Sequence, residues 1–574
     1  MGIEALHKLE AVVAELTSSG QPFELEDVEV RGVHYRHYKK QPDSLAQYFA
    51  VMARHDNKEF VVCQDERYTY GEAYQQASQF AHVLLQDYGV KPGDRVAIAM
   101  RNNPQWMFAF VAAASIGAIV VPMNAWWTGE ELEYGLEDCG AHVVLVDPER
   151  AGRMETFVDR LKLQLVGVGD FSGLSLAVED FAAASQRHID ATMPQVEIAP
   201  DADATIMYTS GSTGHPKGAV ATHRSIIAAM YSWLLLGNAG NIVAEPSSEA
   251  SPEDKTDTKF RPCALMTVPL FHATGSHSLF MLSVIIGRKI VMMHKWNVQE
   301  AMRLIEAERV TNFNGVPTMS AELQTAAQHS PYDLSSLKEI YSGGAARPPD
   351  QVKKITDTFK RSSPGSGYGL TETNALGAVN SGAFYAANPR STGRTVPAVT
   401  DFQIVDDNDR PLPIGERGEV CIKSTANVRG YWNKPEATAR AFKGEWFHSG
   451  DVGYMDEDGF LYIVDRIKEI IIRGGENISC IEVEAAIHLH DAVDEVAVFG
   501  LPDERLGEVV GAAVVVHEGM QLTDMELREY LAGHLAGFKI PQNIWVLREK
   551  LPRIASGKIF KRQLKADYTA QLQQ

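Results

Sequence analysis

The sequence has few cysteines and no cysteine motif. Its five cysteines stand at positions 63, 139, 263, 421 and 480, and no two of them form a CxxC pair. This odd number and wide spacing support neither a disulfide scaffold nor a cysteine zinc site. A reducing compartment is the simplest environment for such a chain, so we expect a cytoplasmic protein.

Basic residues are in deficit. The 574 residues include 54 Lys and Arg against 74 Asp and Glu, which gives a formal net charge of −20. A general nucleic-acid binder needs a basic surface for its phosphate contacts, so we expect no nucleic-acid partner. The deficit does not exclude an anionic substrate, because a local site can reverse the average field.

Long hydrophobic runs are scarce. One nearly apolar run, 106–122, reaches only the lower length limit of a membrane-spanning helix. Ser115 and Gly117 lie inside it, which favours a buried helix that ends at Gly117 and continues as a strand. The N-terminus carries acidic residues and has no long apolar core, unlike a signal peptide. We therefore expect no transmembrane segment.

Two common enzyme signatures are also absent. Neither GxSxG nor HExxH occurs, which argues against the usual serine hydrolases and zinc proteases. The chain length, by contrast, is enough for roughly two to four structural units.

Helix and strand signals alternate through the first half of the chain. Thr69-x-x-Glu72 and Thr128-x-x-Glu131 are capping boxes, which mark helix starts. Short apolar runs such as RVAIAM at 95–100 indicate strands. Helices alternating with such strands predict an α/β fold whose mostly parallel sheets are covered on both faces.

The character of the sequence changes near residue 465. The downstream runs DEVAVFGL, EVVGAAVVV and NIWVLREKL indicate strands, and Thr523-x-x-Glu526 caps a helix. About a hundred residues with their own strands and helices predict a separate, small α+β domain.

One segment, 240–258, interrupts the α/β pattern. It is polar and acidic and contains two prolines, which favours a mobile surface loop. A regulatory or partner-binding loop is the alternative.

The strongest local signal is the run YTSGSTGHPKG at 208–218. Its glycines let backbone N–H groups approach a ligand, while its hydroxyls and Lys217 add donors and positive charge. This combination suits a polyphosphate. No GK[ST] follows, so the run is not a Walker A loop. An ordinary flexible turn is the alternative, and the ordered pattern SGSTGxPKG disfavours it.

This run resembles the phosphate-binding signature of the adenylate-forming (AMP-binding) enzymes, which include acyl-CoA synthetases, firefly luciferases and peptide-synthetase adenylation domains. The chain as a whole resembles the fatty-acyl-CoA synthetases and other acyl-CoA ligases over residues 45–567. Further motifs of the family follow in order: SGGAA at 342–346, GYGLTET at 367–373, WFHSGDVG at 446–453, DRIKEIIIRGGENIS at 465–479 and PRIASGKIFKR at 552–562.

The resemblance implies a domain organisation. A large N-terminal domain, 1–464, is expected to bind ATP and the acid, and to combine mostly parallel sheets layered with helices and a β-barrel-like subdomain. A hinge at 465–469 connects it to a small mobile α+β domain at 470–574.

The resemblance also implies a nucleotide site. It implies that Glu372 is a Mg²⁺ ligand and that Thr371 contacts a phosphate. It also implies that Asp451 binds the ribose hydroxyls and that Tyr368 stacks on adenine. A carboxylate beside phosphates agrees with the preference of Mg²⁺ for hard oxygen ligands. A helix-capping Thr/Glu pair, an ordinary Gly-Asp turn and a core tyrosine are the respective alternatives. The ATP- and AMP-binding residues implied are Thr209, Ser210, Gly211, Ser212, Thr213, Gly214, Lys217, Gly343, Gly344, Ala345, Tyr368, Gly369, Thr371, Asp451 and Arg466.

Lys558 is the residue expected to promote adenylation. Attack of a carboxylate on the α-phosphate joins two anions, and a fixed ammonium between them offsets the repulsion. A solvated surface lysine is the alternative. The resemblance places Lys468 at the hinge, which is a role in mobility and not in catalysis.

The acyl and CoA sites are expected in small and apolar segments. His272 takes the family's position beside the acyl carboxylate, where it shapes or gates the channel; a structural histidine is the alternative. His223 is a weaker candidate near the acyl or thiol channel. Gly474 and Gly475 leave room for the pantetheine of CoA, although a tight turn would also require them. The expected acyl pocket comprises Trp233, His272, Gly343 and Ala375, with Leu234, Leu235, Gly344, Ala345, Leu376 and Gly377 along the same segments.

The expected reaction has two steps. A carboxylic acid and MgATP give an acyl-adenylate and pyrophosphate, and CoA then takes the acyl group and releases AMP. The small, apolar pocket favours a monocarboxylic fatty or aryl acid over a dicarboxylate, and its glycines and alanines leave room for a chain of at least medium length; we expect a medium- or long-chain fatty acid. The alternatives are an aryl-CoA ligase, adenylation for another acceptor, a luciferase-like oxygenase and, outside the enzymes, a nucleotide-binding regulator. A homodimer is left open.

Overall fold

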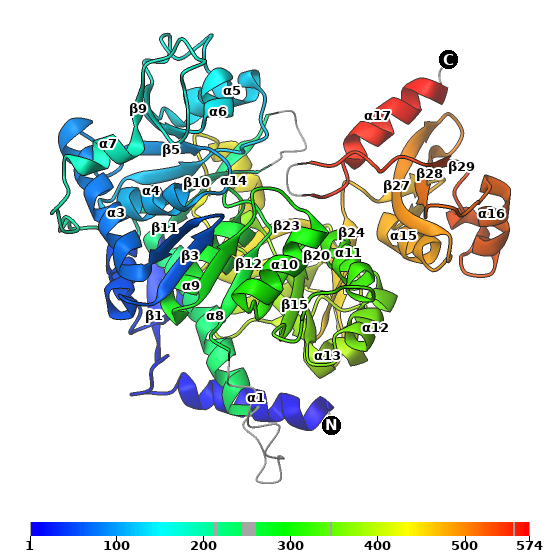
Figure 1. Ribbon diagram of the computed structural model, residues 1–574. Helices are drawn as coiled ribbons and strands as arrows, with labels where there is room; N and C mark the ends of the chain where they lie inside the picture. The colour runs from blue at the N-terminus through cyan, green and yellow to red at the C-terminus, as the bar shows by residue number, and fades with distance from the viewer. Residues whose placement is uncertain (1, 210–214, 244–259, 345–346, 555–556, 573–574) are drawn as a thin grey trace.

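The computed structural model describes residues 2–209, 215–243, 260–344, 347–554 and 557–572. Two large sheets, a smaller antiparallel sheet and a separate C-terminal unit make up the molecule (Figure 1). This is the mixed α/β architecture that the sequence predicts.

The first large sheet carries the start of the phosphate-loop run. Its central strands β5 to β10 pair in parallel, and β10, β11 and β21 continue the sheet as antiparallel neighbours. In order the strands are β21 (Gly430–Tyr431), β11 (Lys217–Thr222), β10 (Asp203–Thr209), β6 (Ile119–Pro122), β5 (Arg95–Ala99), β7 (Val143–Val146), β8 (Gln164–Gly167) and β9 (Val178–Asp180).

The second large sheet has nine strands. Those from β3 to β16 pair in parallel, and antiparallel strands close both edges. In order they are β18 (Arg394–Thr395), β17 (Gly377–Ser381), β16 (Ser363–Gly369), β15 (Glu339–Gly343), β14 (Asn312–Gly315), β12 (Cys263–Met266), β13 (Lys289–Met292), β3 (Glu59–Cys63) and β4 (Glu66–Thr69).

Helices α3 (Tyr70–His82), α4 (Pro104–Ser115) and α8 (His223–Val243) connect the two large sheets through one core. The capping boxes at Thr69 and Thr128 are both present, and the latter starts α5 (Gly129–Cys139). The run 106–122 forms most of α4 followed by β6, and it is buried throughout, as expected.

One helix in the described ranges, α8, is long and apolar enough to span a membrane by length and composition alone. Core helices pass the same test, and Ile226, Ile227 and Met230 of α8 are fully buried in the core between the sheets. The helix continues to Val243, so the first residues of the expected 240–258 loop are helical. The rest of that loop lies outside the described residues.

The smaller antiparallel sheet is the expected β subdomain. Arg466 ends its last strand, and the turn that follows contains Lys468. Its strands are β19 (Thr400–Val405), β20 (Gly418–Ser424), β23 (Trp446–Met455), β22 (Phe442–Lys443) and β24 (Leu461–Arg466).

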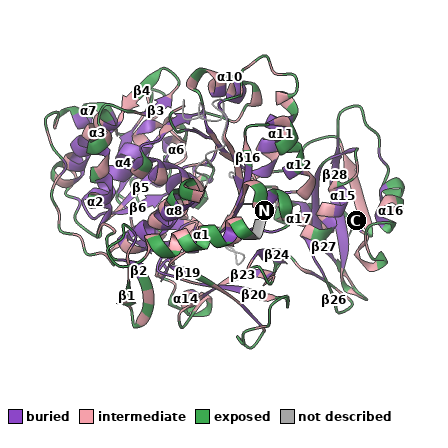
Figure 2. Ribbon diagram, turned by 90° about the horizontal axis from the view of Figure 1, so that it is seen from below, coloured by how far each residue is buried: buried purple, intermediate pink, exposed green. Residues whose placement is uncertain are grey.

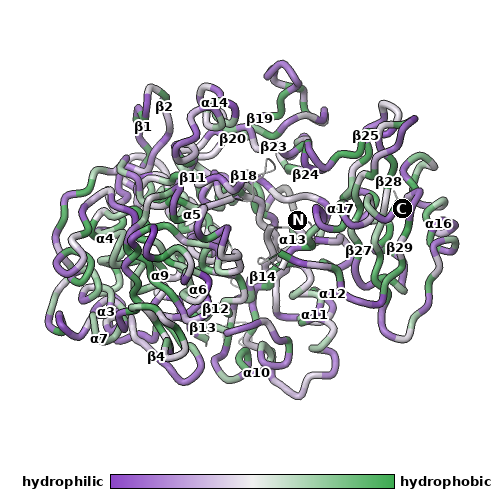
Figure 3. Tube along the Cα trace, turned by 90° about the horizontal axis from the view of Figure 1, so that it is seen from above, coloured by the Kyte–Doolittle hydropathy of each residue, from purple (hydrophilic) through white to green (hydrophobic). Residues whose placement is uncertain are grey.

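The C-terminal unit has its own sheet and its own apolar clusters (Figure 3). The three strands indicated by the sequence are present, and the capping box at Thr523 starts α16. The domain limits and the hinge remain predictions. The elements are β25 (Ile471–Arg473), β26 (Glu476–Ile478), α15 (Cys480–His488), β27 (Val493–Asp503), β28 (Gly507–Val516), α16 (Asp524–Ala532), β29 (Asn543–Leu547) and α17 (Lys561–Leu572).

A segment that the sequence analysis did not anticipate precedes all of these elements. Helix α1 (Gly2–Leu16) crosses the far end of α8, and the hairpin of β1 (Leu25–Val30) and β2 (Val33–Tyr38) follows it (Figure 1). The hairpin is tied to the body through the Tyr38 and Ser232 hydroxyls, whose oxygens are 2.9 Å apart.

Candidate active site

A continuous cavity of about 3470 Å³ lies where the two large sheets, the β subdomain and the C-terminal unit meet. The carboxyl ends of β15 and β16 open into it, which is where ligands bind in open α/β sheets. Most of the predicted site residues line it: Thr209, Trp233, His272, Gly343, Gly344, Tyr368, Gly369, Thr371, Glu372, Ala375, Asp451, Arg466, Lys468 and Lys558.

Lys558 enters the cavity from the C-terminal unit and lies against the SGGAA turn. Gly344 has a φ of +79°, and a Cβ added there would lie 2.9 Å from Lys558 Cε and 3.2 Å from its Nζ. The positive φ favours glycine, and a larger residue would also push the end of the Lys558 side chain away from this position. Desolvation by the surrounding protein, and then the Arg466 guanidinium, lowers the pKa of Lys558. The side chain is nevertheless accessible from the cavity that it lines.

Asp451, on β23, joins two other parts of the chain. Its Oδ2 accepts a hydrogen bond of 2.7 Å from the Tyr368 hydroxyl, and its Oδ1 lies 3.0 Å from Arg466 Nε. Burial raises the pKa of Asp451, while Arg466 and Tyr368 oppose that shift. Asp451 as a residue is only 3% exposed, and it lines the cavity together with these two partners. Two hydroxyls of a sugar can donate to the same two carboxylate oxygens.

Glu372 lies in the 3₁₀ turn η5 (Thr371–Thr373) and is 9% exposed. Its Oε1 accepts a hydrogen bond of 2.8 Å from the hydroxyl of Tyr431 on β21. Lys217 Nζ lies 4.9 Å from the centre of the same tyrosine ring. A buried carboxylate that lines the cavity fits a hard divalent cation such as Mg²⁺.

Tyr431 is a site residue that the sequence analysis missed. Burial, and then Glu372, raises the pKa of its hydroxyl, so the group stays protonated and donates to the carboxylate. Nothing in the run around Tyr431 distinguishes it from a core tyrosine, because its partner lies 59 positions earlier in the chain.

His272 follows β12 and lines the cavity without a partner for its Nε2 among the described residues. Burial, and then Lys558, lowers the pKa of His272 to about 4, so the imidazole is neutral at physiological pH. A neutral ring with one unpaired nitrogen can hold a polar group of a ligand by a hydrogen bond. The Trp233 Nε1 on α8 is likewise buried without a described partner.

The turn after η5 has a left-handed backbone conformation at two residues that are not glycine. Asn374 and Ala375 both have positive φ, at +52° and +61°. A Cβ at Gly369 would lie 2.7 Å from the Ala375 carbonyl carbon, so the chain can pass here only with glycine. Ala375 is thereby presented to the cavity as a small residue.

Several expected lining residues lie elsewhere. His223 is fully buried at the start of α8, where its Nδ1 accepts a hydrogen bond of 3.0 Å from the Leu45 N–H, so it is structural. Leu235 and Leu376 pack into apolar clusters instead of lining the cavity. A Cβ at Gly377 would lie 2.5 Å from the Tyr368 carbonyl oxygen, so it faces strand backbone.

Gly474 and Gly475 form the two-residue turn between β25 and β26, with φ of +59° and +91°. Such a hairpin turn favours glycine at both positions. Neither glycine lines the cavity in this arrangement, whereas Lys468 does. Open space surrounds the position of a Gly475 Cβ.

The phosphate-loop run lies between β10 and β11. Thr209 and Lys217 are opposite each other at the base of this antiparallel pair. Ser210, Gly211, Ser212, Thr213 and Gly214, and Ala345 of the SGGAA run, lie outside the described residues.

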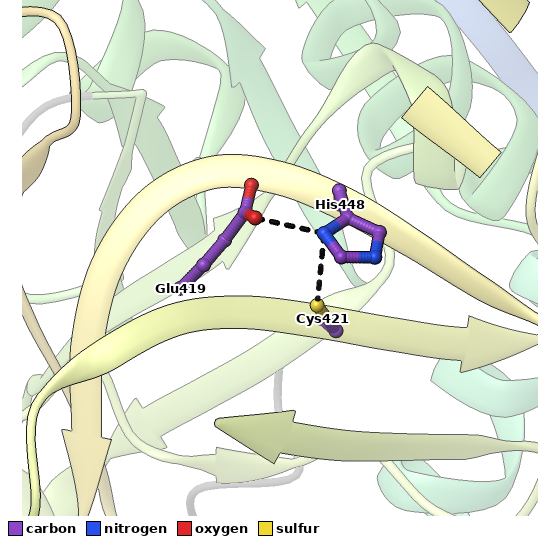
Figure 4. A group of neighbouring side chains, drawn as sticks. All are labelled: Glu419, Cys421 and His448. Atoms are coloured by element: carbon purple, nitrogen blue, oxygen red, sulfur yellow. Dashed lines mark hydrogen bonds and ion pairs between the residues drawn. The ribbon is translucent and has the colours of Figure 1, made fainter. Parts of the chain in front are cut away.

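Glu419, Cys421 and His448 form a close group (Figure 4), and His448 lies on β23, the strand that also carries Asp451. His448 Nδ1 lies 2.7 Å from Glu419 Oε2 and 3.5 Å from Cys421 Sγ, and the Gly450 N–H donates to Glu419 Oε1 at 3.0 Å. Burial, and then Glu419, raises the pKa of Cys421 to about 12, which keeps the thiol protonated. These hydrogen bonds support the turn that presents Asp451.

Comparisons with known proteins agree with this geometry. A family model described as AMP-binding enzyme matches residues 48–432, and one described as AMP-binding enzyme C-terminal domain matches residues 482–558. A feruloyl-CoA synthase of Amycolatopsis sp is 34% identical over 501 residues, which are 87% of this chain and 93% of that protein. A long-chain-fatty-acid–CoA ligase of Bacillus subtilis is 32% identical over 547 residues, covering 90% and 93%.

Solved structures show the same similarity. A fatty acyl CoA synthetase of Mycobacterium tuberculosis has a TM-score of 0.68 and 30% identity, covering 92% of this chain and 99% of that one. The o-succinylbenzoate CoA synthetase of Bacillus subtilis, in complex with its acyl-adenylate intermediate, has a TM-score of 0.74 and 28% identity, covering 90% and 97%.

Proposed function

The chain belongs to the AMP-binding enzyme family, among its AMP-forming acid–thiol ligases, and on that premise we propose that it makes CoA thioesters of medium- or long-chain fatty acids. The observation that carries the proposal is the position of Lys558, which the C-terminal unit brings to Gly344 at the carboxyl end of β15. There it faces the cavity that also contains Asp451 and Glu372.

In the first step the carboxylate of the acid attacks the α-phosphate of ATP, the bond to the β-phosphate breaks, and pyrophosphate leaves. Lys558 is proposed to contact both anions, where its charge offsets their repulsion and positions them. Asp451 is available to the ribose hydroxyls, and Tyr368 beside it to the base. Glu372 would hold Mg²⁺, which supplies positive charge to the phosphates.

In the second step the CoA thiol attacks the acyl-adenylate and AMP leaves. Gly474 and Gly475 lie away from the cavity in the arrangement described, so their proposed contact with pantetheine requires the C-terminal unit to turn about the segment containing Lys468. We propose that the arrangement described serves the first step.

The preference for a fatty acid rests on the cavity wall. Trp233, Leu236, Leu279 and Leu282 line the arm of the cavity along α8. An aromatic acid is the second candidate, because relatives include a feruloyl-CoA synthase and a 4-coumarate–CoA ligase.

A panel of acids tests the proposal. We expect straight-chain saturated acids to support acid-dependent ATP–pyrophosphate exchange, and added CoA to give stoichiometric thioester and AMP. Cinnamate-type and dicarboxylic acids should give a kcat/KM lower by about tenfold or more, a typical discrimination by an apolar pocket. Exchange without CoA consumption would indicate another acceptor, and the absence of acid-dependent exchange would overturn the ligase function.

A further inference from the structure

Helix α1 lies outside the residues matched by the family model, which begin at 48. It crosses the far end of α8 with one face inward and the other exposed (Figure 2). The inward face carries Leu6, Leu9 and Val13, spaced by three and four residues as on one side of a helix. Lys8 lies on the opposite, exposed face.

These three apolar residues line the same cavity as the reacting centre. Along α8 the lining residues extend from Trp233 to Val243, a rise of about 15 Å for ten residues of helix. The cavity thus runs from Lys558 and Gly344 along α8 to α1. Leu6 is only 8% exposed and Leu9 and Val13 are half-buried, so α1 shields one side of this end, while Asn238 and Asn241 of α8, which also line it, are exposed.

The contacts that hold the helix in place use residues other than Leu6 and Leu9, and two of them, Glu10 and Arg394, also line the cavity. Arg394 Nη2 donates to Glu10 Oε1 at 2.8 Å, and the Phe23 N–H donates to the Leu16 carbonyl at 3.1 Å. Val13 and Leu16 also pack beside an apolar cluster that includes Phe23. Leu9 takes part in none of these attachments, so a substitution at Leu9 changes the cavity without removing them.

We propose that α1 is the end wall of the acyl cavity, and that Leu6, Leu9 and Val13 contact the tail of the bound acid and set the upper limit of its chain length. This rests on the proposed function, because it presumes that the cavity along α8 holds a straight-chain acid. Residues within contact of the last methylenes then act as specificity determinants, since one methylene in an apolar pocket changes kcat/KM by about tenfold or more.

The test is a chain-length profile of three variants. Leu9→Trp adds bulk inside the cavity, Leu9→Ala removes it, and Lys8→Trp adds the same indole on the exposed face of the same helix. For saturated acids of about 4 to 20 carbons, Leu9→Trp should lower kcat/KM for the longest accepted acids by about tenfold or more and that for hexanoate by less than about twofold. Leu9→Ala should extend the profile to longer acids, and Lys8→Trp should leave it unchanged.

Binding without ATP gives a readout that does not need the reaction. Leu9→Trp should weaken the binding of dodecanoate, or of the longest acid the wild type binds, and spare hexanoate. A profile and a binding preference that match the wild type, in a variant whose melting temperature shows that it is folded, would overturn the role of α1 and leave the ligase function intact. A wild type that activates no acid overturns the ligase function, and the binding preference still decides whether α1 limits the chain.

Discussion

At the scale of single residues, the cavity depends on pairs whose members are far apart in the chain. Glu372, Asp451 and Lys558 were predicted as site residues because each lies in a short ordered motif. Tyr431, which donates to Glu372, was not predicted, because a tyrosine acquires such a role only when the fold brings β21 next to η5. The sequence therefore indicates the charged groups better than the neutral groups that orient them.

Glu372→Gln tests the proposed cation site at this scale. The amide keeps the size of the carboxylate and removes its charge, so we expect the Mg²⁺ concentration for half-maximal ATP–pyrophosphate exchange to rise by about tenfold or more. Tyr431→Phe is the matched control, since it removes one hydrogen bond to the same oxygen but keeps the charge, so it should raise this Mg²⁺ concentration by clearly less than Glu372→Gln does. A Glu372→Gln enzyme with unchanged Mg²⁺ dependence would show that the cation is held elsewhere.

Buried histidines predict an acid-sensitive fold. Burial lowers the pKa of His277 to about 4, and its Nδ1 lies 2.9 Å from the Ser276 hydroxyl. Between about pH 6.5 and pH 4 the unfolded chain binds the proton that the folded chain does not, so stability is complete above this window and is lost as the pH falls through it.

His277→Asn should reduce the loss of unfolding free energy between pH 7 and pH 4.5 by about 2–3 kcal/mol, measured by urea unfolding at the two pH values. His7→Asn, a change at an exposed position, should leave this difference unchanged. An identical pH dependence in the wild type and in His277→Asn would mean that His277 is protonated in the folded state.

At the scale of elements, the sequence predicts where helices start but not what each element packs against. The capping boxes at Thr69, Thr128 and Thr523 each start a helix, because the cap satisfies backbone donors locally whatever the rest of the fold does. His223 was placed near the channel on its position in the sequence, yet it packs against Leu45. The role of α1 also depends on what it covers, which a helical pattern does not reveal.

Gly475→Leu tests the proposed CoA contact in the β25–β26 turn. At a φ of +91° a leucine is strained, so Gly519→Leu is the matched control: Gly519 has a φ of +81° and equally open surroundings in the same unit. We expect both variants to lose a similar 1–2 kcal/mol of stability, about the cost of such a conformation. Only Gly475→Leu should slow thioester formation from a supplied acyl-adenylate, by about tenfold or more.

The Gly475→Leu test depends on comparing the rate of thioester formation with the rate of ATP–pyrophosphate exchange. ATP–pyrophosphate exchange should stay close to the wild-type rate, because the turn lies away from the cavity in the arrangement described. A selective loss of exchange, or an equal loss in the two glycine variants, would refute the CoA contact.

At the scale of the whole molecule, the formal charge of −20 describes the surface and not the site. Arg466 and Lys558 both face one cavity, although one ends β24 and the other lies in a loop of the C-terminal unit. The family motifs made the α/β fold and the separate C-terminal unit predictable. The extent of the cavity along α8, and the position of α1 beside it, could not be predicted, because both depend on how distant helices pack.

The two-step reaction is tested most directly by measuring both half-reactions of Lys558→Ala. Removal of the ammonium that lies against Gly344 should lower acid-dependent ATP–pyrophosphate exchange by about a hundredfold or more, a typical loss for one electrostatic contact to a transition state. In Lys558→Ala, thioester formation from a supplied acyl-adenylate should stay within about threefold of the wild type. The control is Lys539→Ala, which removes a lysine paired with Glu482 in the same unit, and both of its steps should stay within about threefold of the wild type. An equal loss of both steps in Lys558→Ala would contradict a lysine that acts only in adenylation.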